Sequence, residues 1–388
     1  MKKFVSIVLC VFFAFAMLIP AYAETDNKLR FNEDGNFRIM QISDIQDGTL
    51  LTPAAKKFIK EVVIEAKPDL VVLTGDNISA GSATVGIKAI DLQLVKYGIS
   101  NYMSVFEEIG VPVAIVFGNH DAEQIVSKEE QMAFYSEYDC CLAVDEGDAL
   151  YGCGTYNLPV FSSNGTRIKF NVWVFDSNDY DENGKYSCVQ TDQIEWYKKR
   201  AEELKNANGG SPLPAILFQH VPVDDMGNLF EECNFWDEGA SIGDDGKCYR
   251  LNQEIASGYH AGAMIPGATT EQFRAWKECG DVLGAYFGHW HTEGYTGTWD
   301  GIELGFTYGC EFAKPGPYGV RVFTLYENDI KNFDNELYTY EGSYKSGASL
   351  ELQVDEPYAV YDNAVEEFFA AIKNVFVLLK TEIVSLFA

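Results

Sequence analysis

The sequence predicts an α/β fold, built as a four-layer α/β/β/α sandwich in which two mixed β-sheets pack face to face and helices flank them. Short, uninterrupted apolar runs, typical of buried strands, alternate with helical segments along the first half of the chain. Strand-like runs crowd the second half as well, so we expect two sheets. With 47% apolar residues, the chain can also bury a sizeable core.

The first half follows the order strand, helix, strand, helix, strand. Two short strands over 29–31 and 37–42 flank a turn at 32–35, where Asp34 and Gly35 favour chain reversal. A helix is predicted over 53–67, because Pro53 suits a first helical turn and Thr52 is placed to cap it. The later elements are a strand over 70–74, a helix over about 90–109 and a strand over 112–117.

The second half continues the pattern around one long interruption. A helix begins near Thr191 and carries Ile194, Trp196 and Leu204. Residues 223–270, rich in Gly, Asp, Asn and Glu, form a predicted irregular insertion, and such insertions are usually functional or disordered. The predicted strands are 170–175, 215–218, 282–287, 301–308 and 319–325.

Both ends of the chain differ from the central domain, which we place at 24–330. Residues 1–23 resemble a signal peptide, with Lys2 and Lys3 before an apolar run and Ala21-Tyr22-Ala23 as the cleavage site, which predicts a secreted or cell-envelope protein. The alternative is an uncleaved membrane anchor. A polar linker is predicted over 331–361, and an amphipathic helix over 362–388 that docks on the main domain or on a partner.

The net charge of −29 argues against a nucleic-acid-binding surface, because an acidic surface repels nucleic acid and anionic membranes. Solubility explains most of this charge. An anionic substrate would therefore need cations at its site.

Eight cysteines follow Cys10, an even number that permits disulfides in an oxidising compartment. Pairing stays open, with Cys233–Cys248 and Cys153 with Cys140 or Cys141 as guesses from proximity in sequence.

Five short polar blocks carry the chemistry, and each comes directly after an apolar strand. Ligands at the carboxyl ends of strands converge in layered α/β folds. Four of the five histidines lie in these blocks, a concentration that chance scatter of structural histidines explains poorly. The blocks are Asp44-Ile45-Gln46, Gly75-Asp76-Asn77, Gly118-Asn119-His120-Asp121, Gln219-His220 and Gly288-His289-Trp290-His291.

The donor types in these blocks predict two metal ions. Carboxylate, amide and imidazole groups together suit Mn²⁺, Fe²⁺ or Zn²⁺ better than Ca²⁺, and the absence of thiolates argues against a structural zinc site. The donors are too many for one tetrahedral ion, so we expect two divalent or mixed-valence ions that share a carboxylate.

In this order, the blocks resemble the calcineurin-like metallophosphoesterases, in particular the branch related to purple acid phosphatases and to the fungal dosage-dependent cell-cycle regulator type. The resemblance spans about residues 37–325 and is carried by Gly-Asn-His-Asp together with Gly-His-x-His. It implies that Asp44 and His291 bind the first metal and that Asp76 bridges both. It assigns the second metal to Asn119, His220 and His289. His120 would lie near the leaving group, and Asp121 either orients His120 or caps a helix.

Two departures from the family pattern concern the first metal. Position 46 is Gln where the family usually has His, and Gln is the weaker ligand. Position 79 is Ser where purple acid phosphatases have an iron-binding Tyr. We therefore expect a more weakly held first metal and no tyrosinate colour.

The resemblance predicts hydrolysis of a small phosphate ester by in-line attack of a hydroxide that bridges ions about 3.5–4 Å apart, without a phosphoenzyme. Phosphomonoesterase, phosphodiesterase and nucleotidase activities stay open. Gln46 supports one alternative, a non-catalytic metal-binding scaffold with a degenerate first site. Metal-dependent amide hydrolysis is another, although no HExxH motif or nucleophile elbow supports it.

The insertion between His220 and His289 supplies candidate substrate contacts. Trp236 and Tyr259 could stack on an organic leaving group, and His260 is a further candidate. The alternative is that the aromatic residues form a small core of the insertion itself.

Overall fold

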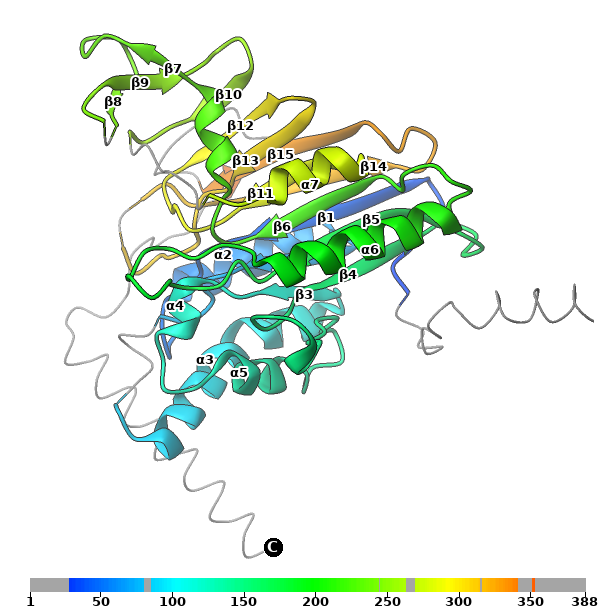
Figure 1. Ribbon diagram of the computed structural model, residues 1–388. Helices are drawn as coiled ribbons and strands as arrows, with labels where there is room; N and C mark the ends of the chain where they lie inside the picture. The colour runs from blue at the N-terminus through cyan, green and yellow to red at the C-terminus, as the bar shows by residue number, and fades with distance from the viewer. Residues whose placement is uncertain are drawn as a thin grey trace, which may run out of the picture.

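Two β-sheets lie face to face, with helices on the outer face of each, in the computed structural model (Figure 1). This arrangement confirms the predicted four-layer α/β/β/α sandwich. The structure describes residues 28–79, 85–243, 245–262, 269–314 and 316–340, and the backbone of 351–352. The predicted signal peptide and the predicted C-terminal helix lie outside these residues.

The six-stranded sheet joins the start of the domain to its end. Its strand order is β16-β15-β14-β1-β2-β3, and β1, β2 and β3 are parallel to one another. β14 pairs antiparallel with β1, with Asn36 opposite Tyr326. The strands are β1 (Asn36–Ile42), β2 (Leu70–Thr74), β3 (Val113–Val116), β14 (Gly319–Tyr326), β15 (Phe333–Tyr340) and β16 (Glu351–Leu352).

The seven-stranded sheet has the order β10-β12-β13-β11-β6-β5-β4. Its centre is parallel, from β5 through β6 and β11 to β13, and antiparallel strands close both edges. The strands are β4 (Tyr156–Phe161), β5 (Ile168–Phe175), β6 (Ala215–Gln219), β10 (Ala256–Tyr259), β11 (Val282–Phe287), β12 (Gly294–Trp299) and β13 (Ile302–Phe306).

Helices α2, α3 and α5 cover the six-stranded sheet, and α6 and α7 cover the other (Figure 1). Thr52 caps α2 as predicted, because its hydroxyl accepts a hydrogen bond from the backbone of Ala55 at 3.2 Å. None of the helices in the described part of the chain is long and apolar enough to cross a membrane. The helices are α2 (Pro53–Ala66), α3 (Lys88–Ile109), α4 (Asn119–Ala122), α5 (Lys128–Tyr135), α6 (Thr191–Ala207) and α7 (Gln272–Cys279).

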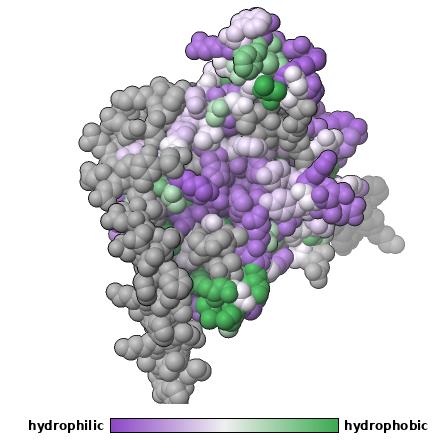
Figure 2. Space-filling model, turned by 90° about the vertical axis from the view of Figure 1, so that its left-hand side faces the viewer, coloured by the Kyte–Doolittle hydropathy of each residue, from purple (hydrophilic) through white to green (hydrophobic). Residues whose placement is uncertain are grey.

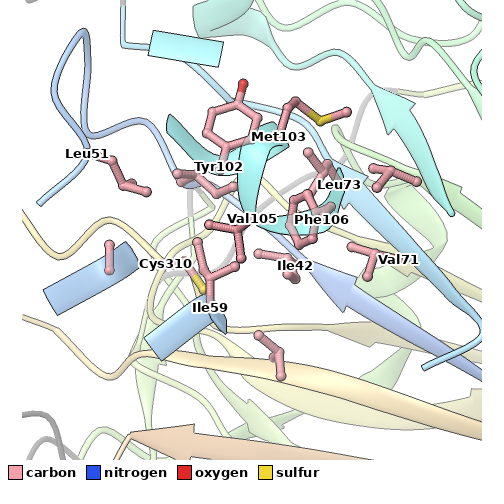
Figure 3. Close-up of a cluster of buried hydrophobic side chains, with 14 of the residues drawn as sticks. Ile42, Leu51, Ile59, Val71, Leu73, Tyr102, Met103, Val105, Phe106 and Cys310 are labelled. Carbon is pink, nitrogen blue, oxygen red and sulfur yellow. The ribbon is translucent and has the colours of Figure 1, made fainter. Parts of the chain in front are cut away.

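The two-residue period of strand β1 explains how one strand serves two cores. Met40 and Ile42 face α2 and α3, in the cluster that Figure 3 shows around Ile42, Ile59 and Phe106. Phe37 and Ile39 point to the opposite face and pack between the two sheets. There they join a ring cluster of Phe218, Tyr286 and Phe323, in which the last two centroids are 4.3 Å apart.

The insertion is more regular than predicted. It holds a 3₁₀ helix at Asp224–Leu229 and a three-stranded sheet of order β7-β9-β8, at Phe230–Cys233, Cys248–Leu251 and Ser241–Ile242. Its strand β10 joins the seven-stranded sheet beside β12. Most side chains of the small sheet are only half-buried, so their hydrophobic alternation is weak in sequence. Figure 1 shows this lobe projecting from the sandwich.

The predicted linker is wrong at its start. Residues 333–340 form β15, and residues 333–339 of this strand pair with β14. The strand is rich in polar residues, but it buries Leu337 and Thr339 on one face while Asp334 and Glu336 on the other are exposed, which is the alternation of a strand with one solvated face.

All eight cysteines of the described region are free thiols. Of the guessed pairings, Cys233 and Cys248 lie directly opposite each other in the β7–β9 ladder.

Candidate metal centre

The predicted metal-binding residues gather at one end of the sandwich, where the parallel strands of both sheets finish. Asp44, Asp76 and Asn119 follow β1, β2 and β3 of the six-stranded sheet. His220 follows β6, and His289 and His291 follow β11, so the other sheet contributes the same number of side chains. Figure 2, which views the molecule from the side where α4 lies, shows a hydrophilic centre on this face.

The first group of converging atoms comprises Asp76, His220 and His289. Their ligand atoms all lie within 4.8 Å of one another. Oδ2 of Asp76 is 3.1 Å from Nε2 of His220, and Nδ1 of His289 is 3.3 Å from that same nitrogen. Each of the three residues is buried, so the group offers three donors to a cation in a site of low solvent access.

The second group comprises Asp44, Asp76 and His291, so Asp76 belongs to both groups. Oδ1 of Asp44 lies 3.5 Å from Nε2 of His291. Gln46 reaches the same imidazole, with Nε2 of the amide 2.7 Å from Nε2 of His291. The oxygen and nitrogen atoms of an amide are told apart only by their surroundings. Rotating the Gln46 amide would therefore place its oxygen, which can bind a metal ion, at this position.

Hydrogen bonds fix the histidine tautomers. Nδ1 of His220 is 2.9 Å from the carbonyl oxygen of Thr74, which makes Nδ1 the donor and leaves Nε2 with a lone pair facing Asp76. Nδ1 of His291 similarly faces Oε2 of Glu311 at 2.8 Å. Such outer partners hold the rings of metal-bound histidines in place.

The charged side chains of the centre shift one another's pKa values. Burial opposes protonation of His220, but the Asp76 and Asp44 carboxylates raise its pKa to about 9. Burial and the neighbouring His220 lower the pKa of His289 to about 3. In the absence of metal, a proton on His220 therefore balances the buried carboxylates. A divalent cation would displace that proton.

Two buried acceptor atoms test whether a cation fits. Oδ2 of Asp76 and Oδ1 of Asn119 are inaccessible to solvent and receive no hydrogen bond as long as Nε2 of His220, 3.1 Å from Oδ2, carries no proton. Buried acceptors without donors are costly. Both atoms belong to residues predicted as ligands, and the surrounding donors are oxygen and nitrogen, the set that suits Mn²⁺, Fe²⁺ or Zn²⁺. The residues present therefore fit a pair of such ions.

The backbone is strained at the ligand positions. Asp44, Asp76 and His289 have φ values of 51°, 49° and 78°, in the left-handed region that non-glycine residues rarely adopt. Gly118 makes a close approach possible, because a Cβ at this position would lie 2.2 Å from Oδ1 of Asp76. These features direct the ligand side chains that follow the strands toward the same place.

His120 lies at the rim of the centre, with its side chain 39% exposed and Nε2 4.0 Å from Oδ2 of Asp76. Its Nδ1 is 2.7 Å from Oε2 of Glu123. The Asp121 carboxylate instead accepts the backbone N–H groups of Gly118 and Asn77 at 2.8 and 3.0 Å. Of the two predicted roles for Asp121, this geometry favours the capping role. Glu123 is the carboxylate that orients His120, and its i+3 spacing on a helical turn was the available signal.

Two tyrosines that the sequence analysis missed line the centre. The phenol of Tyr180 accepts a hydrogen bond from Nδ2 of Asn119 at 3.0 Å and donates one to Oε1 of Glu123 at 2.6 Å. The rings of Tyr186 and His289 form a T-shaped pair, with centroids 4.3 Å apart. Both tyrosines flank a turn after β5, so their place after a buried strand was the missed signal.

The three predicted substrate contacts have other surroundings. Trp236 is 80% exposed in the loop between β7 and β8. The ring of Tyr259 contacts that of Tyr308, with centroids 6.3 Å apart. His260 bonds with Glu293 at 2.9 Å and Ser241 at 3.2 Å.

Ser241, His260 and Glu293 are linked by hydrogen bonds as in an acyl-transfer triad, but Ser241 is buried. Its hydroxyl donates to the carbonyl oxygen of Tyr249. These contacts tie the lobe to the segment after β11.

The chain is similar to known phosphoesterases. A family model described as calcineurin-like phosphoesterase matches residues 37–293. "Probable inactive purple acid phosphatase 14" of Arabidopsis thaliana is 26% identical over 337 residues, which cover 78% of this chain and 77% of that protein.

"Phosphatase DCR2" of Saccharomyces cerevisiae is 24% identical over 241 residues, which cover 56% of this chain and 40% of the yeast protein. Among solved structures, a dimetal phosphatase from Danio rerio aligns with a TM-score of 0.47 and 13% identity over 74% of this chain and 95% of its own.

Proposed function

The chain belongs to the calcineurin-like phosphoesterase family, in the branch of the purple acid phosphatase-like proteins and yeast phosphatase DCR2, and from this premise we propose that it hydrolyses small phosphate esters at a two-metal centre. The observation that carries the proposal is the double membership of Asp76. One carboxylate shared by two groups of converging donors is what a pair of bridged ions requires.

In the proposed site, Asp44, His291 and Gln46 would hold one ion, and Asn119, His220 and His289 the other. The ions would supply Lewis acidity toward the phosphoryl oxygens and lower the pKa of water toward neutrality. Asp76 would hold both, and the left-handed backbone at Asp44, Asp76 and His289 would keep the donors in place before substrate binds.

His120 would protonate the leaving oxygen. It lies at the rim, and Glu123 holds its Nδ1, so Nε2 is the atom free to face a substrate. Glu123 would also keep the ring in this orientation, because its carboxylate stays 2.7 Å from Nδ1. Because a water molecule would be the nucleophile, no side chain of the centre would become phosphorylated.

An assay of the Mn²⁺-loaded protein tests the proposal. We expect turnover of p-nitrophenyl phosphate or of bis(p-nitrophenyl) phosphate, and the ratio of the two rates would classify the enzyme as a monoesterase or a diesterase. Asn119→Ala should lower kcat/KM by about a hundredfold or more, since even outer-shell changes cost 10–100-fold. Asn228→Ala, an exposed asparagine in the 3₁₀ helix, is the matched control and should match the wild type.

A non-catalytic metal-binding scaffold is the second candidate. Gln46 in place of the usual histidine favours it, and so does the word "inactive" in the name of the Arabidopsis relative. Metal content decides between the candidates: two ions per chain with no turnover of either ester would support the scaffold, whereas turnover that is lost in Asn119→Ala would reject it.

We also propose that the protein is secreted or retained in the cell envelope. The basic, apolar and small-residue pattern of residues 1–23 supports this. Mass spectrometry of the mature protein should find Glu24 as its first residue, and an intact Met1 would contradict cleavage.

A further inference from the structure

A stacked tyrosine pair stands beside the metal centre. The rings of Tyr180 and Tyr186 have centroids 5.6 Å apart and planes inclined by 27°. They are 37% and 44% exposed, so each keeps a substantial accessible surface. Stacking surfaces of this kind bind planar groups with little loss of side-chain entropy.

The backbone holds the pair in place. Residues 179–187 form a short hairpin in which Tyr180 and Tyr186 are directly bridged. The N–H of Ser187 donates to the carbonyl of Asp179 at 3.0 Å, and that of Asp181 to Lys185 at 2.7 Å. The hydrogen-bonded backbone of this hairpin therefore fixes the positions of the two rings.

Each tyrosine also contacts a residue proposed for the reaction. Tyr186 packs against His289, a proposed ligand of the second ion. Tyr180 bridges Asn119 and Glu123, and Glu123 in turn holds His120. The pair therefore lies on the same side of the centre as His120, the proposed leaving-group acid. The departing alcohol would form on this side.

We propose that the Tyr180–Tyr186 pair is a specificity surface that stacks on an aromatic leaving group, so that the preferred substrates are phosphate esters of aromatic alcohols. This inference rests on the proposed function and names its substrate class. Tyr186 supplies the stacking face, and Tyr180 orients it while its hydroxyl stays bonded to Asn119 and Glu123.

Benzyl phosphate and cyclohexylmethyl phosphate provide the test, because both release a primary alkoxide of similar size and only one contains an aromatic ring. The Tyr186→Leu variant should lose about 3- to 10-fold in kcat/KM for benzyl phosphate, the range that aromatic stacking contributes, and stay within twofold for cyclohexylmethyl phosphate. Tyr186→Phe should keep both rates. Tyr151→Leu, at a 58% exposed tyrosine outside the centre, is the control and should change neither.

Equal losses for both esters in Tyr186→Leu would overturn the inference, because they would mean that Tyr186 only supports His289. No loss for either ester would overturn it as well.

A binding measurement separates this inference from the proposed activity. Isothermal titration calorimetry of the Mn²⁺-loaded protein with benzylphosphonate and cyclohexylmethylphosphonate needs no turnover. Tighter binding of benzylphosphonate to the wild type, lost in Tyr186→Leu, supports the stacking surface even if neither ester is hydrolysed. Equal affinities for the two phosphonates would overturn it even in an active enzyme.

Discussion

At the scale of single residues, Gln46 decides how well the first ion is held. Its amide occupies the place of the usual histidine and already contacts His291 at 2.7 Å. An amide oxygen is a neutral and weaker donor than an imidazole, so the first ion depends mainly on Asp44, Asp76 and His291.

Gln46→His should therefore tighten the first ion by about tenfold or more, the scale of ligand-sphere changes. The measurement is a Mn²⁺ titration by calorimetry, with the two binding steps fitted separately. Gln46→Leu, which removes the donor, should weaken the same step and leave the other unchanged. Identical first-step affinities in wild type, His and Leu variants would show that position 46 does not touch the ion.

Glu123→Gln should slow the hydrolysis of esters with poor leaving groups more than that of p-nitrophenyl phosphate. The reason is that a poor leaving group needs the proton of His120, and Glu123 orients the His120 ring. We expect about a tenfold larger loss in kcat for an alkyl ester, in line with the 10²–10⁴-fold contribution of a complete general acid. A uniform loss across leaving groups would instead mean that Glu123 only supports the fold.

At the scale of elements, a buried ion pair fastens α5 to the chain that leads from β5 into the tyrosine hairpin. Nζ of Lys128 lies 2.5 Å from Oδ2 of Asp176, and the two side chains are 11% and 1% exposed. Asp176 also accepts the backbone N–H groups of Cys153 and Asn178. The pair thus anchors the base of the hairpin.

Lys128→Met should lower the free energy of unfolding by about 3 kcal/mol, because it leaves the Asp176 carboxylate buried without a counter-charge. Lys96→Met is the matched control: its exposed pair with Glu137 should cost about 1 kcal/mol or less. Urea denaturation of both variants measures the two losses in the free energy of unfolding. Equal losses would mean that the buried pair stabilises the fold no more than the exposed pair does.

The pair also predicts a pH dependence. Burial lowers the pKa of Lys128, but Asp176 outweighs this and raises it above its usual value of 10.5. Because the folded pKa exceeds the unfolded one, the stabilisation is complete below about pH 10.5 and is lost as pH rises through the folded pKa. The difference in the free energy of unfolding between the wild type and Lys128→Met should therefore become smaller only in strongly alkaline solution.

Elements with a uniform pattern were predictable from the sequence, and those with mixed surroundings were not. The buried strands at 70–74 and 170–175 are apolar on both faces, so their pattern was clear. Strand β15 has one solvated face, and its polar residues suggested a linker. Ligands were predictable because they follow buried strands, whereas the hydrogen bond between Tyr180 and Glu123 spans 57 residues, and no local pattern encodes that pairing.

At the scale of the whole molecule, the proposed centre joins the two sheets. Asp44, Asp76 and Asn119 come from one sheet, and His220, His289 and His291 from the other. Ions bound between them would cross-link the sandwich at one end, in addition to the apolar core between the sheets.

Removal of metal should therefore lower the melting temperature. Each ion at a hundredfold excess over its Kd would add about 2.7 kcal/mol to the free energy of unfolding. Thermal denaturation with EDTA, and after Mn²⁺ is restored, measures this shift. Asp76→Asn, which alters the shared carboxylate, should melt at the same temperature in both conditions, and an equal shift in that variant would indicate metal bound elsewhere.

The pairing of β14 with β1 has a consequence for the order in which the chain emerges from the ribosome. Strand β1 is complete at residue 42, but its antiparallel neighbour begins only at residue 319. Through most of synthesis, β1 is an open edge, which is a template for pairing with other chains. The sheet that carries half of the proposed ligands can close only after nearly the whole domain has been translated. Until its last core strands arrive, a nascent chain therefore offers this edge to other chains.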